Sequence, residues 1–280
     1  MSVIGFSIDR NEHIGTRICF LKSTSARKSN VNPAWRKRLA TAFTASTLAV
    51  SGWGSFIADA SASTASATSS AACTNEADFQ AGTVVEYESR DNLSSAISRG
   101  KTETLGREAF ADANPVASAH TSFLNNAPFF LTTTFAEIKD GRLIRYGDRH
   151  GAGASLVTTL YQPPASTPID LQPGQTVTVS YKNKAVSAGA TIEFDVVEKL
   201  TYNGRETIKT ALGTFDTCKF TNEISTGSAS ATQPKNVVVV QNWFPADGPY
   251  RGQSIRSVTP PANGVAQRIS EVIKMQYEAR

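Results

Sequence analysis

Between Gly82 and Val258 the chain is a succession of short runs rich in Val, Thr, Tyr and Phe, separated by turn residues. Runs of this kind favour β-strands, because β-branched and aromatic side chains fit a pleated sheet. The same stretch contains no amphipathic segment of helix length. The pattern predicts an all-β domain, either a single antiparallel β-sandwich or an open, curved half-barrel.

Two dipeptides within this region predict tight hairpins. Asp140-Gly141 separates the runs 129–138 and 142–146, and Asn203-Gly204 follows the run 191–202. Both dipeptides tolerate the positive φ angles of two-residue hairpin turns. The final run, 266–277, fits a helical stripe as well as a strand. We favour a strand there, because the sheet needs a closing edge.

The first 72 residues differ from the rest of the chain. They carry eight Lys and Arg against three acids, so the whole chain has a net charge of +4 while residues 73–280 have −1. A basic cluster at 35–38, an apolar run at 39–50 and small-x-small triplets between Ala58 and Ala67 follow the order of a secretory signal peptide. We expect an export leader over 1–72 and the β domain over 73–280.

Three alternatives for the leader stay open. The apolar run could be an uncleaved anchor, although it is shorter than the roughly 20 residues that a membrane span needs. Cys73 could carry a lipid, although no Leu precedes it at the third position back. Translation could also begin later than Met1, for example at Val31. We expect the protein to be periplasmic or secreted and to keep no stable membrane span after cleavage of the leader.

The near-neutral body also bears on possible partners. Contact with phosphate requires clustered Lys and Arg, and most of the excess positive charge lies in the leader. A nucleic-acid partner is therefore not expected.

The three cysteines predict one disulfide. Loss of the leader removes Cys19 and leaves Cys73 and Cys218 in an oxidising compartment. An even number of cysteines in an exported domain is consistent with a disulfide bond. We therefore expect Cys73 and Cys218 to pair, which would connect the start of the mature chain to a strand near its end.

Residues suited to catalysis or metal binding are scarce. Outside the leader, His120 and His150 are the two histidines, and no Cys-x-x-Cys, His-x-His or Gly-x-Ser-x-Gly motif occurs. We interpret the polar, glycine-rich stretch 148–155 as a hairpin loop. Of the acids in the run 191–202, Glu193 and Asp195 share the face opposite the apolar side chains, which indicates a solvated sheet face. No catalytic, cofactor-binding or metal-binding residue is predicted, and no cofactor is expected.

An aromatic patch near the end of the domain is a candidate ligand site. Trp243 and Phe244 are followed closely by Tyr250, beside glycine and proline turns. Aromatic rings next to such turns can line a pocket. Packing in the core is the commoner role of such residues.

Several motifs together resemble exported, β-rich bacterial proteins of unknown function, the TapB-like and DUF3108-like families. The matching segments are 101–110 (KTETLGREAF), 140–147, 161–164, 171–176 and, above all, 206–220 followed by Trp243-Phe244. The resemblance implies a β-rich fold and export. It implies no catalytic residues.

These observations lead to one expectation and two alternatives about function. The chain is expected to be an exported β domain without enzymatic activity that binds an envelope lipid, a glycan or a partner protein. One alternative is a periplasmic hydrolase using His150 or His120. The other is a structural protein of the cell envelope.

Overall fold

The computed structural model describes residues 69–94, 96–227, 236–262 and 264–280. Residues 1–68 of the predicted leader, which include its cleavage triplets, Cys19 and Val31, lie outside these residues. The part of the chain that the structure describes includes no helix of the length and apolarity needed to cross a membrane. Ser70, which precedes the predicted boundary between residues 72 and 73, is buried in the structure.

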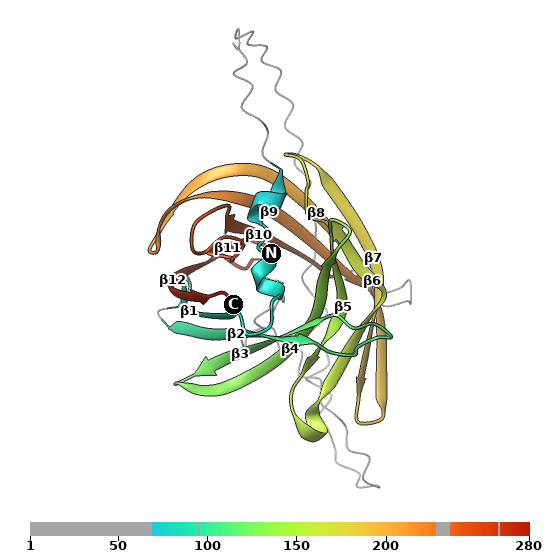
Figure 1. Cartoon of the computed structure of the whole chain (residues 1–280). Helices are drawn as coiled ribbons and strands as arrows, with labels where there is room; N and C mark the ends of the chain where they lie inside the picture. Colours follow the sequence, from blue (N-terminus) through green and yellow to red (C-terminus); the bar gives the residue numbers. More distant parts are fainter. Residues whose placement is uncertain (1–68, 95, 228–235, 263) are drawn as a thin grey trace.

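The described residues form a closed barrel of twelve antiparallel strands, in which each strand pairs with the next and β12 pairs with β1 (Figure 1). The strands are β1 (Val84–Asp91), β2 (Ile97–Arg107), β3 (Val116–Leu124), β4 (Ala127–Lys139), β5 (Arg142–His150), β6 (Val157–Pro168), β7 (Thr176–Ser187), β8 (Ala190–Thr210), β9 (Gly213–Gly227), β10 (Asn236–Pro245), β11 (Arg256–Thr259) and β12 (Arg268–Glu278).

The prediction of a β-sandwich or an open half-barrel was therefore wrong. The last strand pairs with the first along its length, from Val84 opposite Glu278 to Asp91 opposite Ser270. This pairing removes both free edges of the sheet. A local pattern of strands and turns cannot reveal it, because the two partners lie at opposite ends of the domain sequence.

One of the two predicted hairpin turns is present, and the other is a bulge. Asp140 and Gly141 connect β4 to β5, and both have positive φ angles. Asn203-Gly204 instead lies within the continuous strand β8, where the register with β9 shifts between Tyr202 and Gly204. Asn203 is the extra residue of this β-bulge, and Gly204, which follows it, has a φ of 108°. The dipeptide allows both geometries, and pairing with β9 selects the bulge.

The meander places the connections alternately at two ends of the barrel. Those following the odd-numbered strands β1 to β11 lie at one end, which we call the rim end, and those following β2 to β10 lie at the other. The segment 69–82, which we call the plug, includes the short helices η2 (Ser70–Cys73) and η3 (Glu76–Phe79) and lies within the ring of strands (Figure 1). We call the end that it fills the plug end.

The main core lies between the plug and the barrel wall. Cys73, Tyr202, Phe220 and Phe244 are almost fully buried in one cluster. The rings of Tyr202 and Phe220 lie 5.1 Å apart, and those of Phe220 and Phe244 lie 5.7 Å apart. Large inward side chains from β8, β9 and β10 thus pack against the plug and fill this half of the interior.

Candidate functional site

Contacts with the plug identify which side chains of the wall face inward. Thr104 on β2 donates a hydrogen bond to the carbonyl of Asp78 in the plug, and Cys218 on β9 is bonded to Cys73. Side chains alternate between the two faces of a strand, so Thr102 faces inward with Thr104. Residues paired with Thr102 across the sheet then share the inner face.

A row of inward side chains crosses four strands towards the rim end. His120 on β3 lies opposite Thr102 on β2 and Thr132 on β4, and Thr132 lies opposite His150 on β5. The His120 ring is within hydrogen-bonding distance of Thr102 (3.1 Å from Nδ1) and of Ser122 (3.2 Å from Nε2). Both histidines named in the sequence analysis therefore lie on the inner wall.

Aromatic rings accompany these polar groups. The ring of Tyr87 on β1 is stacked with that of His120, with centroids 6.1 Å apart and an interplanar angle of 17°. The ring of Phe130 on β4 lies 6.0 Å from that of His150. This part of the wall therefore combines flat apolar surfaces with hydroxyl and imidazole groups.

A chain of polar contacts continues from His150 along the wall. Its Nδ1 lies 3.2 Å from a carboxylate oxygen of Asp148, and the Tyr161 hydroxyl donates to the other carboxylate oxygen at 3.3 Å. The Tyr161 ring packs on that of Tyr181, with centroids 4.8 Å apart. Burial raises the pKa of Tyr161, and the nearby Asp148 carboxylate adds to this effect, so the phenol stays protonated at neutral pH.

The chain ends in a buried ion pair. Tyr181 and Arg145 both donate hydrogen bonds to the Glu198 carboxylate. Arg145 lies on β5 and Glu198 on β8, so their contact links strands that are not neighbours and crosses the interior. Burial acts to lower the pKa of Arg145, but the Glu198 charge outweighs it and holds this pKa above its ordinary value. The ion pair links one part of the wall to another.

Solvent reaches the part of the inner wall near the rim end. Tyr87, Thr102, His120 and Thr132 are all partly exposed, and the His150 side chain is 36% exposed. The inward side chains beside the plug, such as Phe220 and Phe244, are at most 2% exposed. Polar groups thus line the accessible half of the interior, which makes this half the candidate site.

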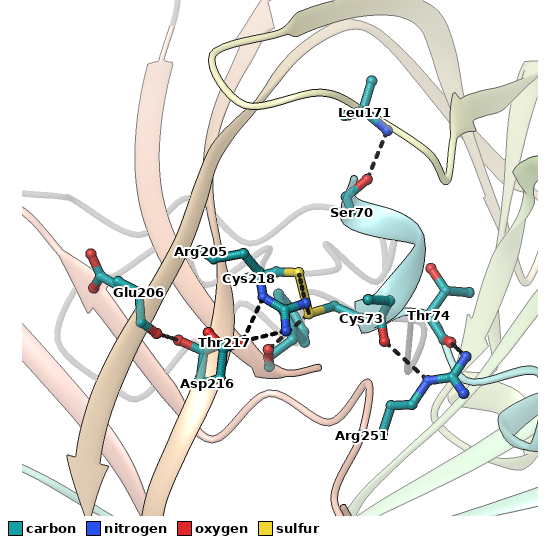
Figure 2. Close-up of a disulfide and its surroundings, with 12 residues drawn as sticks. Ser70, Cys73, Thr74, Leu171, Arg205, Glu206, Asp216, Thr217, Cys218 and Arg251 are labelled. Carbon is teal, nitrogen blue, oxygen red and sulfur yellow. Dashed lines mark hydrogen bonds and ion pairs between the residues drawn. A yellow bond between two sulfur atoms is a disulfide. The ribbon is translucent and has the colours of Figure 1, made fainter. Parts of the chain in front are cut away.

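The predicted disulfide between Cys73 and Cys218 is present, with the Cα atoms 6.1 Å apart (Figure 2). The Arg205 guanidinium lies over it, with Nη1 3.9 Å from the sulfur of Cys73 and 3.8 Å from that of Cys218. Arg205 also donates to Asp216 through Nε at 3.1 Å. Both cysteines are almost fully buried, so the disulfide secures the plug within the core.

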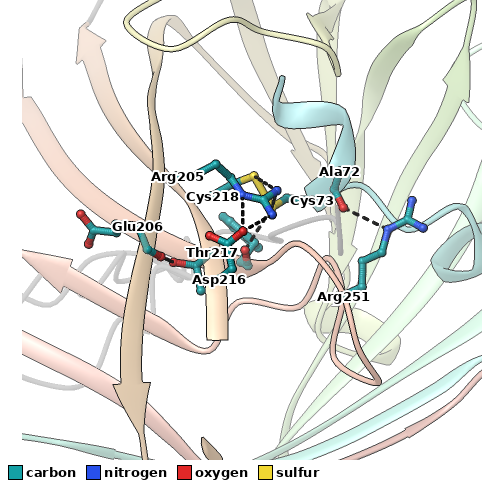
Figure 3. Close-up of polar contacts among 9 residues, drawn as sticks. Ala72, Cys73, Arg205, Glu206, Asp216, Thr217, Cys218 and Arg251 are labelled. Atoms are coloured by element: carbon teal, nitrogen blue, oxygen red, sulfur yellow. Dashed lines mark hydrogen bonds and ion pairs between the residues drawn. A yellow bond between two sulfur atoms is a disulfide. The ribbon is translucent and has the colours of Figure 1, made fainter. Parts of the chain in front are cut away.

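Hydrogen bonds also hold the first half of the plug (Figures 2 and 3). Near its start, the Ser70 hydroxyl donates to the Ile169 carbonyl and accepts from the Leu171 amide, both at 2.8 Å. Arg251, in the β10–β11 loop, donates to the carbonyls of Ala72 and Thr74. The plug is therefore an integral part of the domain.

The predicted aromatic patch lies in the packing of the domain. Trp243 and Phe244 are adjacent on β10 and point to opposite faces, and they are 5% and 0% exposed. The Trp243 indole donates to the Glu206 carboxylate, and the Lys219 ammonium lies 4.9 Å from its ring. The Tyr250 hydroxyl donates to the Met275 carbonyl at 3.2 Å. The structure does not bring these three rings together around one pocket.

Sequence reasoning found the two histidines of the inner wall and missed most of their neighbours. Glu193 and Asp195 are about half exposed and pair with lysines on β7, as expected for a solvated face. Glu198 is buried instead. Glu198 is two and four residues from the apolar Val196 and Phe194 and therefore shares their face of the strand. This alternation was the one signal in the sequence that Glu198 is buried. Arg145 and Tyr161 gave no comparable signal, because their partners come from other strands.

Two further observations concern metal ions and grooves. In the residues that the structure describes, no three His, Cys, Asp or Glu side chains are grouped as a metal site. A groove of about 360 Å³ runs along the charged wall beside Glu88, Arg99 and Lys274. A second groove, of about 420 Å³, lies beside the plug at Phe79 and Glu137. Neither groove contains the histidines of the inner wall.

No family model and no curated protein matches this chain, so the resemblance to the TapB-like and DUF3108-like families is not confirmed. Solved structures with a similar arrangement include a Bacteroides fragilis protein described as exported and as having a YmcC-like fold. It shares 12% identity over 70% of this chain and 96% of its own, with a TM-score of 0.45.

A Parabacteroides distasonis protein described as a lipoprotein shares 15% identity over 71% of this chain and 96% of its own, also with a TM-score of 0.45. The hypothetical lipoprotein YmcC of Escherichia coli shares 12% identity over 69% of this chain and 84% of its own, with a TM-score of 0.32. Similarity at this level does not assign a function to the chain.

Proposed function

We propose that this chain is an exported binding protein without enzymatic activity, and that the inner wall near the rim end binds a glycan. Periplasmic or secreted location is supported by the order of the leader sequence and by the buried Cys73–Cys218 disulfide, since such bonds persist in oxidising compartments. A glycan is favoured among the possible envelope ligands because of the chemistry of the wall.

The observation that carries this proposal is the group around His120. Thr102, Ser122 and the imidazole offer hydrogen-bonding groups, and the Tyr87 ring lies stacked beside them on a partly exposed inner wall. Sugars present hydroxyl groups that need such partners. They also present apolar C–H faces, which pack on aromatic rings.

A glycan microarray of bacterial envelope saccharides, probed with the full chain, tests the proposal. We expect binding to a defined set of saccharides, followed by titration of the best one. Thr132→Ala removes an inward hydroxyl, and Thr133→Ala removes the neighbouring hydroxyl that faces outward on the same strand. Loss of one ligand hydrogen bond weakens binding by about tenfold, and only the Thr132 variant should show it. An array without any bound saccharide, or equal effects of the two variants, would refute the proposal.

A second candidate, a hydrolase, is favoured by the contact of His150 with Asp148 at 3.2 Å. An imidazole oriented by a carboxylate is a common general base. Incubation of the bound saccharide with the chain, analysed by mass spectrometry, separates the two functions. Cleavage that disappears in His150→Ala would favour the hydrolase. A chain that neither binds nor cleaves would favour the structural envelope protein.

A further inference from the structure

The rim end carries an unusual number of exposed apolar side chains. Thirteen large apolar residues are strongly exposed in the described part of the chain, and all except Leu105 lie at the rim end. Their exposures range from 37% to 64%. We call these twelve residues the apolar rim: Leu93, Ile97, Leu124, Phe129, Phe130, Leu131, Leu156, Val186, Ile192, Val237, Val238 and Val265.

The apolar rim surrounds the whole barrel. Six connections lie at this end, and each is flanked by or contains at least one residue of the rim. Leu93 lies between β1 and β2, Leu124 ends β3, Leu156 precedes β6 and Val265 precedes β12. Residues Val186 and Val237 flank the remaining two connections, so the apolar side chains form a ring rather than a patch on one side.

Charge is depleted at the same end. In the described residues, the rim-end loops 92–96, 125–126, 151–156, 188–189 and 260–267 contain no Asp, Glu, Lys or Arg. The sixth connection, 228–235, lies outside the described residues, and its sequence has one charged residue, Lys235. The plug-end loops, in contrast, contain Glu108, Asp112, Asp140, Asp170, Asp247 and Arg251.

Charged pairs resume on the outer wall just beyond the rim. Arg99 pairs with Glu88 at 3.2 Å, and it lies only two residues along β2 from the rim residue Ile97. Lys184 pairs with Glu193, next to the rim residue Ile192. The surface that is both apolar and uncharged is therefore a shallow band at the tips of the hairpins.

We propose that the apolar rim docks on the surface of a lipid bilayer, with the barrel opening facing the head groups. A ring of separate tips can insert side by side into a fluid, flat surface, whereas a folded protein partner would need an annular groove of matching shape. Burial of apolar side chains at the boundary between head groups and acyl chains stabilises such binding. The band of charged pairs limits the depth of insertion, because charges are costly in hydrocarbon. This inference does not depend on glycan binding.

The basic residues Arg99, Lys184 and Arg268 near the rim are paired with Glu88, Glu193 and Asp91, so the attraction to a bilayer is expected to be apolar. Binding to vesicles of pure phosphatidylcholine should therefore be close to binding to vesicles that also contain phosphatidylglycerol. Binding through a polybasic surface, in contrast, depends strongly on the content of anionic lipid.

Co-sedimentation of the full chain with phosphatidylcholine vesicles tests the proposal. The rim variant combines Leu93→Ser, Phe129→Ser, Val237→Thr and Val265→Ser, which lie on four different hairpins, and the control is Leu105→Ser on the outer wall. All three proteins share the same leader, so differences between them report on the rim. We expect partition of the rim variant to fall by about tenfold or more, because apolar area is lost, and that of Leu105→Ser to match the wild type.

Three outcomes would overturn the proposal. The wild-type chain could fail to sediment with vesicles, the rim variant could sediment as much as the wild type, or Leu105→Ser could lose as much sedimentation as the rim variant. Size-exclusion chromatography measures the oligomeric state of the same proteins.

If the wild type forms a dimer that the rim variant does not form, and vesicle binding is absent, the rim joins two copies of the chain. Glycan binding by the rim variant, measured in solution, reports on the proposed function independently.

Discussion

At the plug end of the barrel, the interior is filled by residues 69–82 and by large side chains of the wall, and the loops carry charge. At the rim end, the inner wall includes Thr, Ser, His and aromatic residues, and the loops are uncharged and flanked by exposed apolar side chains. The two ends are built from the same twelve strands. The comparison teaches that strand pairing makes the barrel, while the side chains at each end decide whether the interior there is filled or open to solvent.

Removal of the disulfide at the plug end should cause the largest loss of stability. Replacing both Cys73 and Cys218 with Ser releases a loop closed over a sequence separation of 145 residues. In the chain-entropy model, this lowers the free energy of unfolding by up to about 5 kcal/mol. Urea denaturation of the double variant and the wild type measures the difference.

The same double variant also tests whether a change at the plug end leaves vesicle binding by the rim end unaffected. At a urea concentration where it is still folded, we expect its vesicle sedimentation to equal that of the wild type. A change in unfolding free energy below about 1 kcal/mol would contradict the stabilising role of the disulfide.

A pair of phenylalanine variants compares the ends directly. Phe244→Ala at the plug end leaves a cavity among fully buried rings, so unfolding should become easier by about 3 to 5 kcal/mol. Phe130→Ala at the rim end removes a ring that is 38% exposed, and we expect less than about 1 kcal/mol. Thermal and urea denaturation of both variants measure these values. Similar losses in the two variants would show that the ends are equally well packed.

Asp78 in the plug should make the free energy of unfolding depend on pH. Burial raises the pKa of Asp78, even though its carboxylate accepts hydrogen bonds from Tyr277 and Gln253, both at 2.9 Å. A carboxyl whose folded pKa exceeds its unfolded pKa adds stability at low pH, and this contribution is lost as the pH rises through the folded pKa. Asp78→Asn should therefore gain stability relative to the wild type as the pH rises towards neutral.

Glu137 on β4 supplies a control of opposite sign. Burial acts to raise its pKa, but hydrogen bonds from Arg107 and Tyr146 outweigh burial and lower it. Its contribution is present above the unfolded pKa and is lost as the pH falls through the folded pKa. Glu137→Gln should thus lose stability relative to the wild type near neutral pH. Urea midpoints between pH 3 and pH 8 measure both variants, and a gain for Asp78→Asn that grows as the pH falls would contradict the assignment.

The smallest effect on stability should come from the rim itself. Each of Leu93→Ser and Val265→Ser is expected to change the free energy of unfolding by no more than about 0.5 kcal/mol, because both side chains are more than half exposed. Losses above about 2 kcal/mol in denaturation experiments would show that the rim packs against the folded domain. In that case its exposure could not be interpreted as a binding surface.

The sequence was sufficient for the features that depend on neighbours along the chain. Alternation predicted strands, Asp140-Gly141 predicted the turn between β4 and β5, and the final run was expected to be a strand, as β12 is. The pairing of Cys73 with Cys218 followed from the number of cysteines that remain once the predicted leader is left out. Each of these inferences requires only local geometry or composition.

Tertiary structure decided what depends on distant partners. Closure of the barrel rests on the pairing of β1 with β12, and the bulge at Asn203-Gly204 rests on the register with β9. Arg145 meets Glu198 across the interior from a strand that is not its neighbour. The apolar rim, likewise, is twelve scattered residues in the sequence, and only alternation of the connections gathers them at one end. Local patterns specify which faces are apolar, but strand order and closure determine where those faces meet.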